Sequence, residues 1–113
     1  PLTLCIKNKN MIVFNTTYTM PNEDARNFVI WAHQAYMPKA TSTLLLKKGR
    51  LLRVLSHKDE ETECFSLQFE VESTAILHKW YQETGKELNE ELLTIFDKRI
   101  TGFSTILEVI DGE

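Results

Sequence analysis

Residues 64–72 read CFSLQFEVE, a strict alternation of apolar and polar residues that predicts a β-strand with one buried face. Phe65, Leu67, Phe69 and Val71 share one face, and the polar residues between them share the other. Such a strand is typical of an antiparallel sheet that is packed on one side and polar on the other. The rest of the chain is therefore expected to supply neighbouring strands and helices that cover the apolar face.

Three other segments have the composition of strands. Residues 44–57 form an extended run rich in Leu, Val and Arg, and the charged stretch 58–62 that follows predicts a solvated turn, so this run and residues 64–72 indicate a hairpin. Residues 11–19 are rich in β-branched and aromatic side chains, and residues 103–110 form an apolar run that begins after Gly102. Four strands are therefore predicted.

Two segments have helical spacing of their apolar residues. Asn22 is a predicted N-cap for the first helix, and Pro38 is expected to end or kink this helix because proline disfavours helical dihedrals in the residue before it, leaving residues 39–43 as a connector. Ser73 is a predicted N-cap for the second helix, which Gly85 is expected to end before a short third helix around residues 88–96. The apolar stripes of the first two helices include Trp31 and Trp80, which are expected to lie in the core.

The predicted order is β-α-β-β-α-β, which indicates an α+β, ferredoxin-like fold with a four-stranded antiparallel sheet and helices on one face. Right-handed crossovers place the first and third strands at the centre. We expect one domain at residues 11–110, preceded by an N-terminal extension at residues 1–10. The helix-free face of the sheet must be exposed to solvent, bind a ligand or contact a second copy of the chain.

Composition narrows the classes of partner. The 113 residues carry 13 basic and 16 acidic side chains, a net charge of −3, which gives no electrostatic basis for binding nucleic acid or an anionic membrane surface. No apolar run approaches the roughly twenty residues that span a bilayer. The only cysteines, Cys5 and Cys64, do not form a disulfide framework. We therefore expect a cytoplasmic protein without nucleic-acid or membrane partners.

The sequence contains no motif that identifies a reaction. His33, His57 and His78 are scattered and lack a second ligand at metal-binding spacing. Nucleotide-binding glycine loops and nucleophile motifs are also missing. We accordingly expect no metal and no cofactor, and no catalytic residue is assigned.

Four polar residues on predicted strands are candidates for ligand binding: Arg53, Gln68, Glu70 and Glu108. Arg53 is expected to lie beside Gln68 or Glu70 on the adjacent strand, or to meet Glu108 of the partner subunit in a dimer. Two interpretations stay open, namely a structural ion pair beneath a dimer contact and an anchor for a small polar ligand.

Several short stretches are similar to a known family. They are MIVFNTT at 11–17, Trp31 followed by Met37-Pro38, LRVLS at 52–56, FSLQFEVES at 65–73 and FSTILEV at 103–109. With these the chain resembles the bacterial family of domain of unknown function 4286 over residues 11–110. Where that family is expected to have His-Ile-Pro, this chain has Tyr36-Met37-Pro38, so no imidazole role is transferred. The resemblance implies a ferredoxin-like domain similar to the dimeric α/β-barrel group, with no established activity.

Two functional hypotheses follow. The leading one is a non-catalytic cytoplasmic homodimer, with a small polar ligand at the sheet face as an open option. The alternative is a small enzyme with little need of cofactors, like the monooxygenases that resemble the dimeric α/β-barrel group. A deep cavity on the helix-free face that contains Arg53, a carboxylate and a histidine would favour the enzyme, and a filled contact would favour the assembly.

Overall fold

The structure, a computed structural model, describes residues 10–112. The expected N-terminal extension lies outside these residues except for Asn10. The strands are β1 (Ile12–Pro21), β2 (Lys47–Arg53), β3 (Thr62–Val71) and β4 (Thr101–Glu108). The first helical segment consists of α2 (Asn22–Trp31), the π-helical turn η1 (Ala32–Tyr36) and α3 (Met37–Thr41). The second consists of α4 (Thr74–Trp80), the π-helical turn η2 (Tyr81–Gly85) and α5 (Lys86–Phe96).

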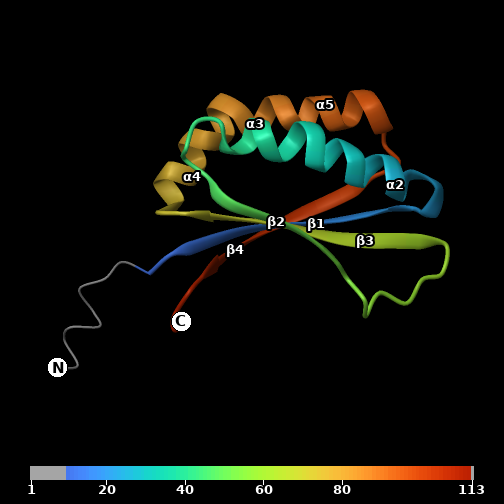
Figure 1. The fold of residues 1–113 in the computed structure, drawn as a ribbon, viewed down its shortest axis with the longest axis horizontal. Coiled ribbons are helices and arrows are strands. Elements are labelled where there is room, and N and C mark those ends of the chain that lie inside the picture. Colours follow the sequence, from blue (N-terminus) through green and yellow to red (C-terminus); the bar gives the residue numbers. More distant parts are fainter. Residues whose placement is uncertain (1–9, 113) are drawn as a thin grey trace.

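The four strands form one antiparallel sheet in the order β2-β3-β1-β4. The first and third strands are therefore central, as predicted. Both helical segments lie over the same face of the sheet, and the other face is bare (Figure 1). This is the ferredoxin-like arrangement that the element order predicts, and the fold class is confirmed.

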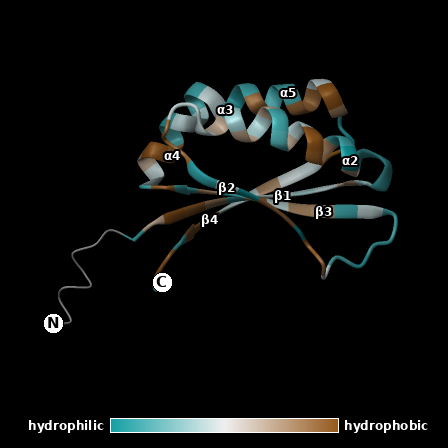
Figure 2. Cartoon of the chain, viewed as in Figure 1, coloured by the Kyte–Doolittle hydropathy of each residue, from teal (hydrophilic) through white to brown (hydrophobic). Residues whose placement is uncertain are grey.

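The alternating residues of β3 form the floor of the core. Phe65, Leu67, Phe69 and Val71 are at most 3% exposed, which confirms the face assigned to them. Phe28 of α2 is fully buried and stacks on Phe65 with ring centroids 5.8 Å apart. Two further core residues, Trp31 and Trp80, are also buried, as expected. Apolar and polar residues alternate along the helices and strands, whereas the loop between β2 and β3 is mostly hydrophilic (Figure 2).

The first helix does not end at Pro38. The N–H of Met37 bonds to the carbonyl of Ala32, five residues earlier, so the hydrogen-bond register has already shifted when the chain reaches Pro38. The π-helical turn thus accommodates a proline that has no N–H to donate. The predicted connector at residues 39–43 is helical as far as Thr41.

Gly85 does not end the second helix either. Its backbone is helical, and a Cβ atom placed there would lie 2.5 Å from Cζ3 of Trp80. Glycine is therefore needed because the indole packs directly against the helix backbone. The predicted N-cap at Ser73 is confirmed, since its Oγ accepts a hydrogen bond of 3.1 Å from the N–H of Ile76. The predicted N-cap at Asn22 is wrong, because α2 already includes Asn22 and no side chain caps its N-terminus.

The strand β2 is shorter than the predicted run at residues 44–57. Leu44 and Lys48 have positive φ angles of 65° and 53°, and the pairing with β3 shifts between Lys47 and Arg50. This bulge changes which residues of β2 face the helices, because one extra residue reverses every later side chain in a strand.

Replacement of Phe69 by alanine tests the packed face. Phe69 is 1% exposed, so Phe69→Ala should lower the free energy of unfolding in urea by about 3 to 5 kcal/mol. Leu55→Ala is the matched control, because Leu55 is 87% exposed and its loss should cost within about 0.5 kcal/mol. A cost below about 1 kcal/mol for Phe69→Ala would show that the face is assigned wrongly.

Candidate functional site

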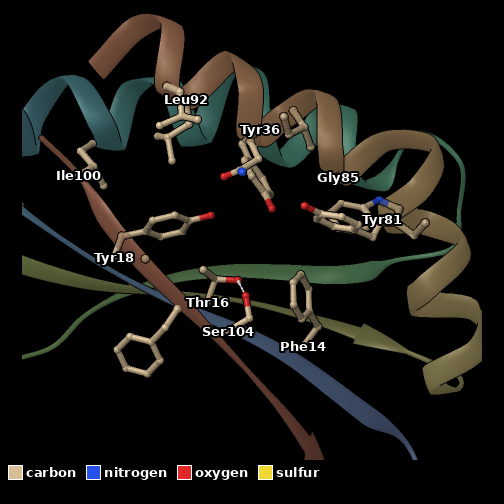
Figure 3. Close-up of a pocket in the computed structure, with 15 residues that line it drawn as sticks. Phe14, Thr16, Tyr18, Tyr36, Tyr81, Gly85, Leu92, Ile100 and Ser104 are labelled. Atoms are coloured by element: carbon tan, nitrogen blue, oxygen red, sulfur yellow. Dashed lines mark hydrogen bonds between the residues drawn. The ribbon is translucent and has the colours of Figure 1, made fainter. Parts of the chain in front are cut away.

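A cavity of about 240 Å³ lies between the sheet and the helices, where β1 and β4 meet η2 and α5 (Figure 3). The residues that line it are all uncharged at neutral pH. They are Phe14, Thr16, Tyr18, Tyr36, Trp80, Tyr81, Leu88, Asn89, Leu92, Leu93, Ile100, Phe103 and Ser104, with Gly85 and Gly102. The chain has three tyrosines, and all three line this space, which we call the tyrosine cavity.

The three tyrosines come from different elements. Tyr18 is on the helix-facing side of β1, while Tyr36 is the last residue of η1 and Tyr81 the first of η2. Their hydroxyl groups point toward a common space above the side chains of Thr16 and Ser104 (Figure 3). Because π-helical turns alter the direction of side chains and recur at functional sites, their position here supports a functional cavity.

Hydroxyl groups supply the polar surface of the cavity. Oγ1 of Thr16 and Oγ of Ser104 are hydrogen-bonded at 3.0 Å across β1 and β4. Burial raises the pKa of Tyr18, although hydrogen bonds with Tyr36 and Thr16 oppose the increase. Burial raises the pKa of Tyr36 well above 10.0, and the nearby hydroxyls of Tyr18 and Tyr81 raise it further. At neutral pH both phenols are therefore neutral groups that can donate and accept hydrogen bonds.

The four residues predicted to bind a ligand do not form one cluster. Gln68 and Glu70 lie on the bare face, whereas Arg53 and Glu108 pair with Phe65 and Ile12 on the helix-facing side, at opposite edges of the sheet. Their role in ligand binding stays a prediction.

The expected pairing of Arg53 with Gln68 or Glu70 is wrong. The register of the hairpin places Arg53 opposite Phe65. Its Nε lies 3.1 Å from Oε1 of Glu63, and its guanidinium carbon lies 5.4 Å from the centre of the Phe65 ring. Arg53 is thus satisfied by a carboxylate as expected, but by one that precedes the alternating stretch.

The polar side chains of the bare face bond to one another. A chain of hydrogen bonds crosses β2, β3 and β1 through Arg50, Gln68, Ser66, Asn15 and Thr17. The donor–acceptor distance is 3.1 Å from Arg50 to Gln68, 3.3 Å from Gln68 to Ser66 and 3.3 Å from Asn15 to Thr17. Exposed apolar side chains flank it, including Leu52 on β2 and Leu107 on β4.

The described residues contain neither a three-residue metal-binding group nor a helix that could span a membrane. Within residues 10–112, no three His, Cys, Asp or Glu side chains come together in a group that could hold a metal ion. None of the helices in that range is long and apolar enough to cross a membrane.

Comparison with known proteins identifies the family. The model of a domain of unknown function, DUF4286, matches residues 11–110. The chain belongs to this family. No curated protein matches the DUF4286 chain in sequence.

Solved structures share its fold at low identity. A dimeric ferredoxin-like protein from an uncultured marine organism is 14% identical with a TM-score of 0.69, over 92% of this chain and 99% of its own. A protein of the ethyl tert-butyl ether D (EthD) family from Bacillus halodurans is 16% identical with a TM-score of 0.67, over 88% of this chain and 99% of its own. A candidate antibiotic biosynthesis monooxygenase from Bacillus cereus is 16% identical with a TM-score of 0.59, over 92% and 97%. For the DUF4286 chain these similarities show the fold alone.

The raised pKa values predict a loss of stability in alkali. A group with a raised pKa in the folded state stabilises the protein fully below its unfolded pKa, near 10.0 for tyrosine, and this stabilisation is lost as pH rises through the folded value. Tyr36→Phe removes one such group. The variant should therefore lose less free energy of unfolding than the wild type between about pH 9 and about pH 11.

Urea unfolding at each pH measures this difference. Tyrosinate absorbance, compared between the wild type and Tyr36→Phe, gives the titration of Tyr36 itself, and protein unfolded in urea is the control. The buried position of the Tyr36 hydroxyl would be contradicted if both proteins lost the same free energy of unfolding in alkali and Tyr36 titrated as it does in the unfolded chain.

Proposed function

We propose that this DUF4286 domain forms a homodimer and binds a small uncharged molecule in the tyrosine cavity of each protomer. The observation that carries the proposal is the convergence of three tyrosine hydroxyls in a cavity lined by uncharged side chains. Concave sites with apolar walls and a few converging polar groups are typical of small-molecule binding.

The lining indicates the chemistry of the ligand. A charged ligand would lose its hydration in the cavity without meeting an opposite charge, which is costly, so a neutral ligand is favoured. The hydroxyls of Tyr18 and Tyr36 can donate to an oxygen or nitrogen atom of such a ligand, and the rings of Phe14 and Trp80 supply apolar walls. The volume of about 240 Å³ suits a molecule with one ring.

The bare face of the sheet supports the homodimer. Its polar side chains already bond to one another, so covering them leaves few groups unsatisfied, and the exposed side chains of Leu52 and Leu107 would gain from burial. A two-fold contact is the commonest way to cover such a face. Two of the similar structures are described as dimeric ferredoxin-like proteins. In this arrangement Gln68 and Glu70 lie in the contact between the sheets.

The enzyme hypothesis is the second candidate and uses the same cavity. The similarity to the candidate monooxygenase from Bacillus cereus favours it. We place binding first because burial keeps the phenols of Tyr18 and Tyr36 protonated, which suits them to hold a ligand by hydrogen bonds.

Light scattering at micromolar concentration tests the homodimer. The wild type should have the mass of two chains, with a contact of about 1,600 Å² in total. Leu107→Glu places a charge on the bare face and should produce monomers. Ile95→Glu is the control, because Ile95 is an exposed apolar residue on α5, in the helical layer on the other side of the sheet, and this variant should remain dimeric. A monomeric wild type would refute the proposal.

Calorimetric titration with phenol tests the cavity. Phenol combines one ring with one hydrogen-bonding group, and we expect a dissociation constant of about 1 mM or tighter. Ser104→Phe should abolish binding, because Ser104 lines the cavity and the new ring would occupy it. Lys86→Phe adds the same ring at an exposed position on α5 and should leave binding unchanged. Absence of binding to the wild type, or undiminished binding to Ser104→Phe, would exclude the cavity as the site.

A further inference from the structure

A second hollow adjoins the tyrosine cavity. It has a volume of about 370 Å³ and lies between α4 and β4, lined by Thr74, Leu77 and His78 on one side and Ile106 on the other. Phe14, Tyr81 and Ser104 line both spaces. We call this second space the outer groove. The three shared residues show that the two spaces are neighbours.

The outer groove exists because the helices do not cover β4. All eight residues of β4 are exposed. Yet Gly102, Ser104 and Ile106 are on the helix-facing side, since they pair with the inward residues Tyr18, Thr16 and Phe14 of β1. The helix-facing side of this edge strand is thus open to solvent, and it leads from the outside to the tyrosine cavity.

The two spaces differ in chemistry. The tyrosine cavity contains the hydroxyls of Tyr18, Tyr36 and Thr16 at its inner end. The outer groove is lined by the aliphatic side chains of Leu77 and Ile106, and also by Thr74 and His78. Tyr81, which is 42% exposed, stands at the junction. The phenol groups of Tyr18 and Tyr36 therefore lie at the enclosed end, and Leu77 and Ile106 supply aliphatic surface along the route to solvent.

We infer that the natural ligand is an elongated molecule with a neutral hydrogen-bonding ring in the tyrosine cavity and an aliphatic tail in the outer groove, passing beside Tyr81. The inference rests on the proposed function and adds a class of ligand to it. Simple 4-alkylphenols have this chemistry, because the hydroxyl can reach Tyr18 and Tyr36 while the chain in the para position points away from them.

A series of 4-alkylphenols tests the inference by calorimetry. Phenol, 4-ethylphenol, 4-butylphenol and 4-hexylphenol are titrated into the wild-type protein. Each methylene buried in the outer groove should tighten binding by up to about four-fold, so affinity should rise steeply once the chain passes Tyr81. Ser104→Phe should abolish binding of the whole series, since Ser104 lines both spaces.

A second variant separates the groove from the cavity. Ile106→Gln makes the outer groove polar and should remove most of the gain that the tail provides while leaving the affinity for phenol unchanged. Ile110→Gln is the matched control, because Ile110 is 76% exposed and lines neither space. This variant should show the same increase in affinity with chain length as the wild type.

The outcomes distinguish the two proposals. If phenol binds but affinity does not increase with chain length, or increases equally in Ile106→Gln, the inference is overturned while the proposed function stands. If phenol does not bind, the proposed function fails and the inference fails with it.

Discussion

The indole N–H of Trp80 donates a buried hydrogen bond of 2.8 Å to the carbonyl of Ala40, and the position of the helices over the sheet depends on this contact. The carbonyl lies near the end of α3, where helix carbonyls lack partners within the helix. Loss of the indole would leave it unsatisfied in the core, at a cost of about 1 to 3 kcal/mol. Gly85 permits the contact, because any side chain there would collide with the indole. Glu91 adds two more bonds between the helical segments, since its carboxylate accepts from Nε1 of Trp31 at 2.9 Å and from Nζ of Lys39 at 2.8 Å.

The tyrosine cavity lies beneath this pair of helices. Trp80 forms part of its wall, and Tyr36 and Tyr81 enter it from the π-helical turns of the two segments. The same helices stop short of β4, which leaves one side of the cavity open toward the outer groove. The packing that closes the core over β1 and β3 thus also creates the candidate site at the edge of the core.

Local patterns predicted the strands and their faces well, because a period of two residues depends only on which side of a strand is buried. They were wrong that Gly85 ends the second helix, and the first helix continues through Pro38, where an end or a kink was predicted. The π-helical turn before Pro38 and the indole against Gly85 are tertiary features, and neither has a signature in the residues themselves. The predicted neighbours of Arg53 on β3 were wrong for a related reason, since a bulge at Lys48 sets the register of β2.

The sequence did not point to the tyrosine cavity, because its candidate ligand-binding residues were polar side chains on strands. Tyrosine on an apolar stripe is ordinary core packing in most proteins, and its hydroxyl usually finds a partner there. One signal was available, because Tyr36 follows Phe28 and Trp31 at helical spacing, which places it on the apolar stripe of the first helix. That Tyr18 and Tyr36 meet Tyr81 around one space follows from the crossing of the helices over the sheet, which one sequence does not reveal.

The mass of the intact protein, purified from its native cells and measured under non-denaturing conditions, tests the central claim most directly. The account predicts two chains that carry one small molecule in each protomer, released on unfolding as a neutral compound with a ring and an aliphatic tail. A single chain, or a dimer that carries no small molecule, would contradict it.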